Sequence, residues 1–148
     1  MDKELLHKKL AKTIVAKLRD ENYDSYIKTK EHARSMSLTE YENTPKNPNL
    51  GPELQKLRDE RFKFLNSLSE EQIKALDKLV LSSLDNTAFN FLSEAEENFH
   101  QVEGTSVGLT IDGKNLESIQ DELLSGTLFG EYFLWVEENS KYGPFQHE

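Results

Sequence analysis

The sequence predicts a mainly α protein (class α+β), a helical bundle with a small C-terminal β hairpin or sheet. Apolar residues recur at three- and four-residue spacing through most of the first 100 positions, which is the period of an amphipathic helix. Near residue 107 the apolar pattern changes to alternation, the period of a strand. The length of 148 residues suits one domain, so we expect residues 1–148 to form a single domain.

The first half of the chain is predicted to be helical. The first helix has one apolar stripe made of Leu6, Leu10, Ile14 and Leu18. A second, shorter helix is predicted from about Asp24 to Met36. Residues 37–51 contain Pro45, Pro48, Gly51 and three asparagines, so we expect a loop there and leave its mobility open.

The next helices begin at recognisable signals. Pro52 suits the first turn of a helix, because that position needs no backbone N–H donor. Ser69 and Gln72 form the pattern of a capping box, after which helical spacing continues to about residue 100. Asp85-Asn-Thr87 are poor helix formers, so both one long helix and two shorter ones are compatible with residues 70–100.

The C-terminal third has a mixed pattern. Val107, Leu109 and Ile111 alternate with smaller residues and are followed by the turn signal Asp112-Gly113. A short helix is predicted from Asn115 to Gly126. The apolar run 132–136 is predicted to be a strand covered on both faces, with a last turn of helix as the alternative.

Charge is unevenly distributed along the chain. Residues 1–80 carry 16 Lys and Arg against 14 Asp and Glu, a net charge of +2. Residues 81–148 carry 2 against 13, a net charge of −11. The chain therefore joins a nearly neutral half to a strongly acidic half.

Composition excludes several classes of function. The absence of cysteine excludes disulfides, thiol catalysis and thiolate metal sites, and it fits a cytoplasmic protein. No phosphate-binding glycine motif points to a nucleotide, no basic surface points to nucleic acid, and no apolar run is long enough to span a membrane. The N-terminal residues lack the apolar core of a signal peptide. We expect no cofactor and no metal.

Two weak motifs keep an enzymatic alternative open. Gly104-Thr-Ser106-Val-Gly108 matches the G-x-S-x-G pattern of hydrolases, but a helix is predicted before the serine and a strand after it, which reverses the required order. Glu97 and His100 form a single E-x-x-H unit, whereas di-metal bundles need two such units. A small hydrolase or metal enzyme is therefore the least favoured hypothesis.

The acidic half is the predicted binding region for a basic protein partner, because clustered negative charge steers a positively charged partner and aromatic residues supply contact energy. Two alternatives remain open: the charge serves solubility only, and Phe133 and Trp135 belong to the core. The predicted partner-binding residues are Glu94, Glu96, Glu97, Asp121, Glu122, Glu131, Tyr132, Trp135, Glu137 and Glu138.

The last third also resembles small acidic bacterial proteins of uncharacterised families, some of which are similar to immunity proteins for secreted toxins. The resemblance is carried by Leu109-Thr-Ile-Asp-Gly113, a short acidic helix, Gly126, Gly130-Glu131, Trp135 and Ser140-Lys-Tyr142. It implies a bacterial, cytoplasmic, non-enzymatic binding protein. The alternative is a structural protein that self-associates, with the basic first helix of one copy against the acidic half of another.

Overall fold

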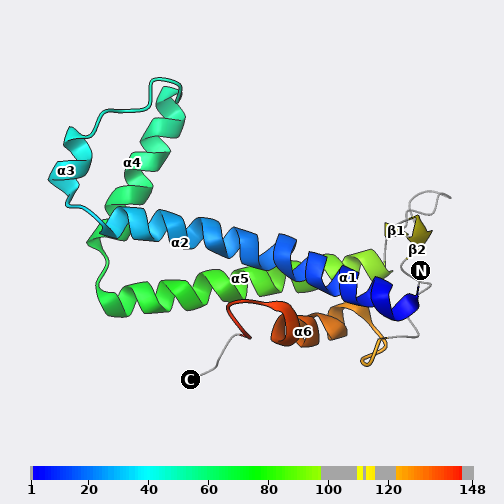
Figure 1. The fold of residues 1–148 in the computed structure, drawn as a ribbon. Helices are drawn as coiled ribbons and strands as arrows, with labels where there is room; N and C mark the ends of the chain where they lie inside the picture. Colours follow the sequence, from blue (N-terminus) through cyan, green and yellow to red (C-terminus); the bar gives the residue numbers. More distant parts are fainter. Residues whose placement is uncertain (1, 98–109, 112, 116–122, 145–148) are drawn as a thin grey trace. The chain divides into compact units, whose positions relative to one another are not determined.

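The computed structural model describes residues 2–97, 110–111, 113–115 and 123–144, and these residues are mainly helical (Figure 1). The mainly α prediction is confirmed. In chain order the elements are α1 (Lys3–Val15), the π-helix η1 (Ala16–Asp20), α2 (Glu21–Arg34), α3 (Leu38–Asn43), α4 (Pro52–Ser67), α5 (Glu70–Glu97), β1 (Thr110–Ile111), β2 (Lys114–Asn115) and α6 (Leu128–Asn139).

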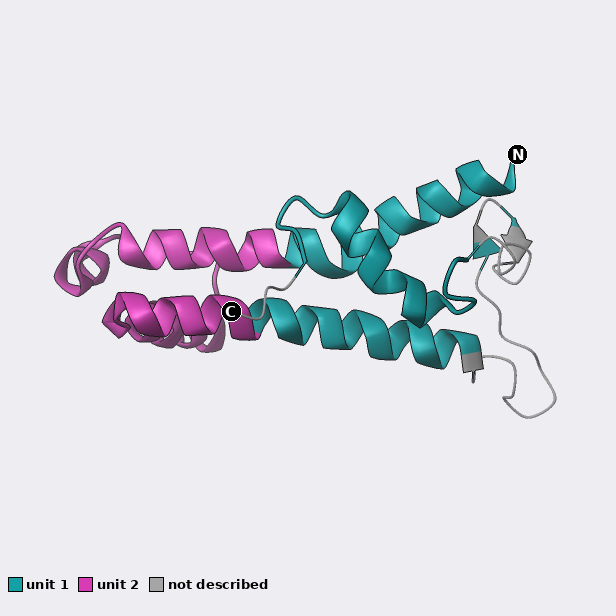
Figure 2. Ribbon diagram, turned by 90° about the horizontal axis from the view of Figure 1, so that it is seen from below, with its two compact units in different colours: residues 1–22, 80–148 teal, residues 23–79 magenta. Residues whose placement is uncertain are grey.

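The chain divides into two compact units (Figure 2). Unit 1 consists of residues 1–22 and 80–148, and unit 2 consists of residues 23–79. Unit 1 therefore joins the N-terminal helix to the C-terminal half of the chain. That both units belong to one domain stays a prediction.

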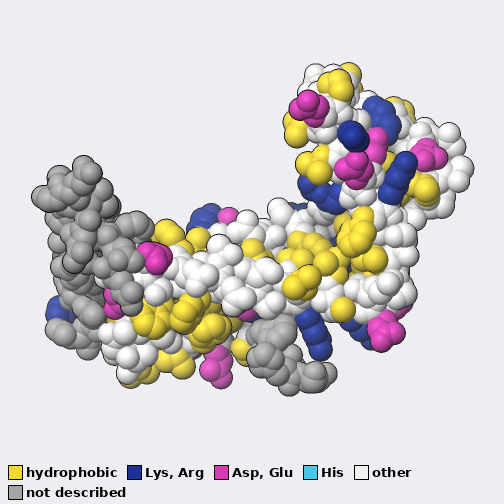
Figure 3. All heavy atoms as spheres, turned by 180° about the vertical axis from the view of Figure 1, so that it is seen from behind, with side chains coloured by type: hydrophobic (Ala, Val, Ile, Leu, Met, Phe, Trp, Pro, Cys, Tyr) yellow, Lys and Arg dark blue, Asp and Glu magenta, His cyan; other side chains and the backbone are white. Residues whose placement is uncertain are grey.

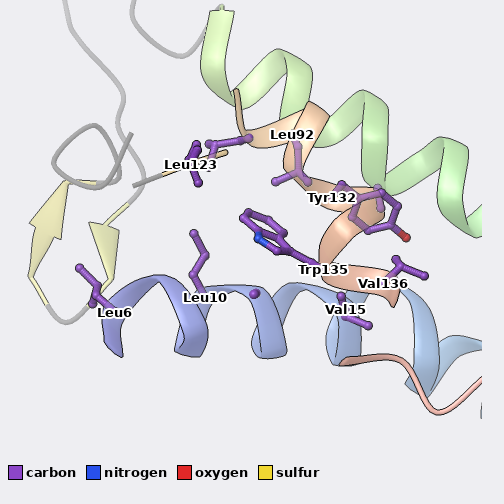
Figure 4. Packing of buried hydrophobic residues seen from close by; sticks show 11 residues of the cluster. Leu6, Leu10, Val15, Leu92, Leu123, Tyr132, Trp135 and Val136 are labelled. Atoms are coloured by element: carbon purple, nitrogen blue, oxygen red, sulfur yellow. The ribbon is translucent and has the colours of Figure 1, made fainter. Parts of the chain in front are cut away.

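The core of unit 1 is formed by α1, α6 and the part of α5 that follows residue 80 (Figure 4). Figure 4 shows the indole of Trp135 between Leu10 of α1 and Leu92 of α5. The buried apolar residues of this core are Leu6, Leu10, Ala11, Val15, Ala88, Leu92, Leu123, Leu128, Tyr132, Trp135 and Val136.

Unit 2 has a smaller core of its own, made of Ala33, Tyr41, Phe62, Leu65 and Ile73. The rings of Tyr41 and Phe62 stack with their centroids 3.7 Å apart. The chain after α2 is also fixed by polar contacts, because the Asn66 amide donates to the backbone carbonyls of Ala33 (2.8 Å) and Met36 (2.9 Å).

Local signals place several helix ends where the sequence predicts them. Pro52 is the first residue of α4, and the capping box of Ser69 and Gln72 starts α5 with both reciprocal hydrogen bonds present. Helix α5 is a single helix through Asp85-Asn-Thr87. Those residues do not break it because Thr87 donates to the carbonyl of Ser83, and the Asp85 carboxylate accepts from distant side chains rather than from nearby backbone.

The predicted loop over residues 37–51 is wrong in its first half, where α3 forms. Ser37 caps this helix in a capping box with Glu40, since the Ser37 hydroxyl accepts from the Glu40 N–H and the Glu40 carboxylate accepts from the Ser37 N–H. The prolines that suggest a loop all lie after Asn43, and no helix forms between that residue and Pro52.

The predicted strand over residues 132–136 is also wrong, because these residues lie inside α6. Thr127 caps the helix by accepting from the Gly130 N–H at 3.1 Å. No larger C-terminal hairpin or sheet is seen among the described residues. The strand pairing described there joins only β1 and β2, two residues each, around Gly113 with its φ of +76°. The predicted helix from Asn115 to Gly126 lies mostly outside the described residues.

Candidate functional site

Helix α6 has one buried face and one exposed face, and these faces divide the predicted partner-binding residues. The buried face follows helical spacing and consists of Leu128, Glu131, Tyr132, Trp135 and Val136. Three predicted binding residues therefore lie in the interior, with exposed fractions of 2% for Glu131, 0% for Tyr132 and 1% for Trp135. This burial gives the three side chains a role in the fold, and their assignment to partner contact stays a prediction.

Glu131 holds the turn that precedes α6. Its carboxylate accepts from the backbone N–H of Ser125 (2.9 Å), the hydroxyl of Ser125 (2.8 Å) and the N–H of Leu124 (3.2 Å). Burial raises the pKa of the Glu131 carboxyl, but these hydrogen bonds, with a contribution from His7, outweigh it and hold the pKa below its ordinary value. Glu131 is therefore a buried anion that fixes the turn.

Tyr132 and Asp85 belong to a buried network around Arg19, whose side chain is fully buried. The Asp85 carboxylate accepts from Arg19 Nε at 2.6 Å and from the Tyr132 hydroxyl at 2.7 Å. Burial and the neighbouring Asp85 raise the pKa of Tyr132 well above its ordinary value, so its hydroxyl remains a donor.

The same network also fixes the C-terminal end of α6. Arg19 Nη1 donates to the Ser140 hydroxyl at 2.6 Å, and that hydroxyl donates to Asp20 at 2.7 Å. Asp20 further accepts from the backbone N–H of Lys141 at 3.0 Å. Arg19 and Asp20 lie in η1, so the π-helix turn carries the residues that tie α1 to α6.

Sequence reasoning does not find this network. In the predicted stripe of α1 every fourth residue is apolar up to Leu18, whereas the buried positions run through Leu10, Ala11 and Val15 to Arg19. The available signal is that Arg19 lies four residues after Val15, on the buried side of the helix.

Trp135 has a polar partner as well as apolar ones. Its indole N–H donates to His7 Nε2 at 2.9 Å, and the two rings lie 5.7 Å apart. His7 Nε2 is also 4.0 Å from the Glu131 carboxylate. Trp135 thus anchors α6 to α1, which agrees with its interpretation as a core residue.

An aromatic cluster, which we call the phenylalanine patch, consists of Phe89 of α5 with Phe129 and Phe133 of α6. Phe89 and Phe129 are partly buried, and Phe133 lies on the exposed face of α6. The Phe89 ring packs 5.3 Å from Phe129 and 6.0 Å from Phe133. Phe133 remains 50% exposed, so this side chain is surface rather than core. Figure 3 shows apolar side chains gathered over α6 with an acidic side chain beside them.

Acidic side chains follow the patch along α6. Glu137 lies one turn after Phe133 on the same face, and Glu138 follows it; both are exposed, and neither forms an ion pair with a described residue. Glu94 on α5 is exposed and has a partner within the chain. These three are the predicted acidic residues that the described structure places at the surface.

The remaining predicted acidic residues have different positions. Glu96 is partly buried, and its carboxylate accepts from the backbone N–H of Leu128 at 2.9 Å, so it caps the first turn of α6. Asp121, Glu122 and the side chain of Glu97 lie outside the part of the structure that is described.

The two units differ strongly in charge. Unit 1 has 8 Lys and Arg against 17 Asp and Glu, a net charge of −9, and unit 2 has 10 of each. The whole net charge of the chain therefore belongs to unit 1. Its phenylalanine patch and exposed glutamates make an acidic, aromatic surface.

The enzymatic motifs gain no structural description. Ser106, His100 and the side chain of Glu97 lie outside the described residues. Elsewhere in the described chain, no group of three or more His, Asp or Glu side chains is arranged to hold a metal ion. No helix in the described part is long and apolar enough to cross a membrane.

Comparison with known protein families, curated proteins and solved structures gives no match to this chain.

Proposed function

We propose that this protein is a non-enzymatic binding protein whose acidic unit 1 engages a basic protein partner through the exposed face of α6. The observation that carries the proposal is the half-exposed Phe133 of the phenylalanine patch, with Glu137 one turn after it and in no ion pair with a described residue, on a unit of net charge −9. A toxin-neutralising, immunity-like role is the specific form that the C-terminal resemblance suggests.

The charge supports this proposal through its effect on association. A surface of one sign attracts a partner of the other sign, raises the association rate and disfavours wrong partners. Charge alone supplies little affinity at an exposed site, because water and salt screen it. The glutamates are thus assigned to steering and orientation.

The aromatic side chains support the proposal through contact energy. Interface centres are enriched in aromatic residues, surrounded by polar residues that exclude water. Phe133 is half-exposed and is held by Phe89 on one side and Tyr132 on the other, with ring centroids 6.0 Å and 5.2 Å away. A side chain held in this way loses little conformational entropy when a partner covers it.

The test is capture from a lysate of the source cells on immobilised protein at about 50 mM and about 300 mM salt, read by mass spectrometry. The test variant F133S/E137Q/E138Q changes the proposed surface and leaves the buried Glu131, Tyr132 and Trp135 intact. The expected result is a basic protein that is retained by the wild type at low salt, is depleted at high salt and is lost from this variant.

Unit 2 offers a matched control, F64S/E31Q/E53Q. Phe64 is 53% exposed, close to the 50% of Phe133, and Glu31 and Glu53 are exposed glutamates. This control has the same change in composition and charge on the other unit, so it should retain the partner. Equal capture by both variants would contradict the proposal.

Self-association is the second candidate, since the chain carries exposed lysines on α1 and exposed glutamates on α6. Two of these lysines are already paired within the chain, Lys8 with Glu4 and Lys17 with Glu21, both at 2.6 Å. This pairing weakens the basic surface that self-association requires. Sedimentation at low and high salt tests it, and a monomer at both salt concentrations rejects it.

A further inference from the structure

Unit 2 contains an open groove between α2 and α4, with a volume of about 430 Å³. Its floor is formed by buried residues of the unit 2 core, among them Ala33, Tyr41 and Phe62. Leu50, Leu54 and Leu57 supply further apolar lining, which we call the apolar wall, and Lys28, Arg58 and Arg61 supply cationic lining.

Helix periodicity brings the groove residues of α4 together. Leu54, Leu57, Arg58 and Arg61 are spaced by three, four and seven residues from the first, so they share one face of the helix. Across the groove, Lys28 and His32 lie one turn apart on α2. The groove thus has an apolar centre with cations on both walls.

The apolar wall is left open to water. Leu54 is 59% exposed and Leu57 is 49% exposed, although Phe62 and Leu65, further along the same face of the helix, are buried. Apolar surface of this kind gains free energy when another apolar surface covers it, by about 25 cal/mol per Å². Two neighbouring half-exposed leucines beside a hollow therefore form a docking surface.

The cations of the groove have no anionic partner. Lys28, Arg58 and Arg61 form no ion pair with any described residue, and none of the groove residues is acidic. Other lysines close by in sequence are paired: Lys46 with Asp59 at 2.7 Å, Lys56 with Glu60 at 3.9 Å and Lys63 with Glu42 at 3.6 Å. The groove therefore presents positive charge that no described residue neutralises in an ion pair. Over α3 and α4, Figure 3 shows Lys and Arg side chains next to apolar ones, with Asp and Glu side chains among them.

We propose that this groove binds an acidic amphipathic segment of a partner protein. The apolar residues of the segment cover Leu54 and Leu57, and its carboxylates pair with Arg58 and Arg61 on one wall and Lys28 on the other. Arginine suits this role because its planar guanidinium binds a carboxylate through two parallel hydrogen bonds. This surface is separate from the phenylalanine patch, so the inference does not depend on the function proposed above.

The geometry favours a peptide segment over a small anionic amphiphile. A pocket for a small molecule normally buries 70–90% of its ligand, roughly, whereas this wall is half-open before anything binds. A single carboxylate also satisfies one of the three cations, but a segment with several acidic residues satisfies all of them. An amphipathic helix with apolar side chains spaced by three and four residues fits a groove of this kind.

A peptide library displayed on phage, with 16 randomised positions, tests the proposal with the full chain as the target. Selection on the wild type should enrich acidic sequences with apolar residues at helical spacing. A fluorescein-labelled synthetic copy of the most enriched peptide is then titrated with each variant and followed by fluorescence anisotropy. The groove variant R58E/R61E should weaken its binding by about tenfold or more, because it reverses two of the three groove charges.

The matched control is K56E/K63E, which makes the same change in net charge on the same helix at residues outside the groove. Its affinity for the peptide should be within about twofold of that of the wild type, since it changes only the overall charge of the protein and not the groove. A second groove variant, L54S/L57S, keeps every charge and should also weaken binding. Circular dichroism of each variant measures whether the helices are retained. We expect them to be retained, because the substituted residues are exposed.

Several outcomes overturn the proposal. Selection of basic peptides, selection of none, or equal loss of binding in R58E/R61E and K56E/K63E would each contradict it. Decanoate serves as a small anionic amphiphile that competes for the groove. If decanoate binds the protein and no peptide does, the ligand is a small amphiphile and the proposal is refuted. Salt-sensitive dimerisation that R58E/R61E abolishes, again without peptide binding, makes the occupant a second copy and also refutes it.

Discussion

Removing the Asp85 carboxylate should be among the most damaging single changes that this fold can undergo. In D85A, Arg19 loses an acceptor at 2.6 Å from Nε and a second contact at 3.4 Å from Nη2. The Tyr132 hydroxyl loses its acceptor at 2.7 Å. Both donors remain buried, because Arg19 and Tyr132 each have an exposed fraction of 0%.

The expected loss of stability is about 3 kcal/mol. Breaking a buried ion pair costs about 3–5 kcal/mol, since it leaves an uncompensated charge in the interior. Asp20 lies 3.6 Å from Arg19 Nη1 and still compensates part of the Arg19 charge in D85A. The expected loss is therefore near the lower end of this range. Stability of a domain is only about 5–15 kcal/mol in total, so D85A consumes much of it.

Urea unfolding followed by Trp135 fluorescence and by circular dichroism measures the loss. Trp135 is the one tryptophan of the chain and is 1% exposed, so its emission reports directly on the unit 1 core. With a urea m value of about 2 kcal/mol per molar, the midpoint should fall by about 1.5 M. E21A is the control, because Glu21 pairs with Lys17 at the surface and its loss should cost at most about 0.5 kcal/mol.

A double variant separates charge burial from packing. R19M alone leaves Asp85 as a buried anion and should also cost about 3 kcal/mol, whereas R19M/D85A removes both charges. The double variant should therefore cost less than the two single losses added together. The reasoning is refuted if D85A costs less than about 1 kcal/mol, or if the two losses simply add.

Three further predictions concern single contacts. The E131Q variant should lose about 2 kcal/mol of unfolding free energy at neutral pH, because a charged acceptor of three hydrogen bonds is replaced by a neutral amide. The Glu131 pKa is held below its ordinary value of 4.5, so this loss should become smaller as the pH is lowered below 4.5, which urea midpoints measure. Hydrogen bonds from Lys46, Tyr41 and Gln55 lower the pKa of Asp59 to about 2, so the stability this residue contributes is present above its ordinary pKa of 3.8 and is lost as pH falls towards 2. D59N should therefore lose less stability than the wild type between about pH 4 and pH 2, and an identical acid profile for the two proteins contradicts this. S37A removes one half of the capping box of α3 and should destabilise this helix by about 1 kcal/mol, measured as faster hydrogen exchange at its amides, with no change at those of α6.

Most of the helical framework is predictable because its signals are local. Pro52 and the pair Ser69 and Gln72 fix helix starts through contacts within one turn of chain. The capping box of Ser37 and Glu40 is the same kind of signal. The prolines and asparagines that follow it nevertheless lead to the prediction of a loop for the whole of residues 37–51. Helix α3 is therefore missed although its own start signal is present.

Helix α6 is missed for a different reason. Its buried face includes Glu131, a carboxylate, whereas Phe133 and Leu134 on its exposed face are apolar. The apolar run 132–136 therefore has no polar face and looks like a covered strand. Glu131 is tolerated there because Ser125 and Leu124 supply donors to it. If a buried position of a helix is allowed to hold a hydrogen-bonded polar residue, the sequence predicts α6.

The buried network lies beyond local reasoning. Arg19 and Asp85 are 66 residues apart in the chain, and Arg19 and Ser140 are 121 apart. The spacing of Arg19 from Val15 indicates the buried side of the helix, but nothing nearby in the sequence identifies the acceptors that allow a cation to be buried there. Only the packing of α1, α5 and α6 determines that this cation is interior.

The packing of α1 against α6 also changes what the charge of the acidic half means. That half has a net charge of −11 by sequence, but unit 1 adds the lysines of α1 to it. Hydrogen bonding and the charge of Glu4 raise the pKa of Lys8, and the charge of Glu138 on α6 makes the smallest contribution. Under the proposed function, a basic partner should therefore be attracted to the part of α6 that α1 neutralises least. Glu137 follows Phe133 on one face of the helix, and this is the position where substitution should most strongly reduce both the affinity and its salt dependence.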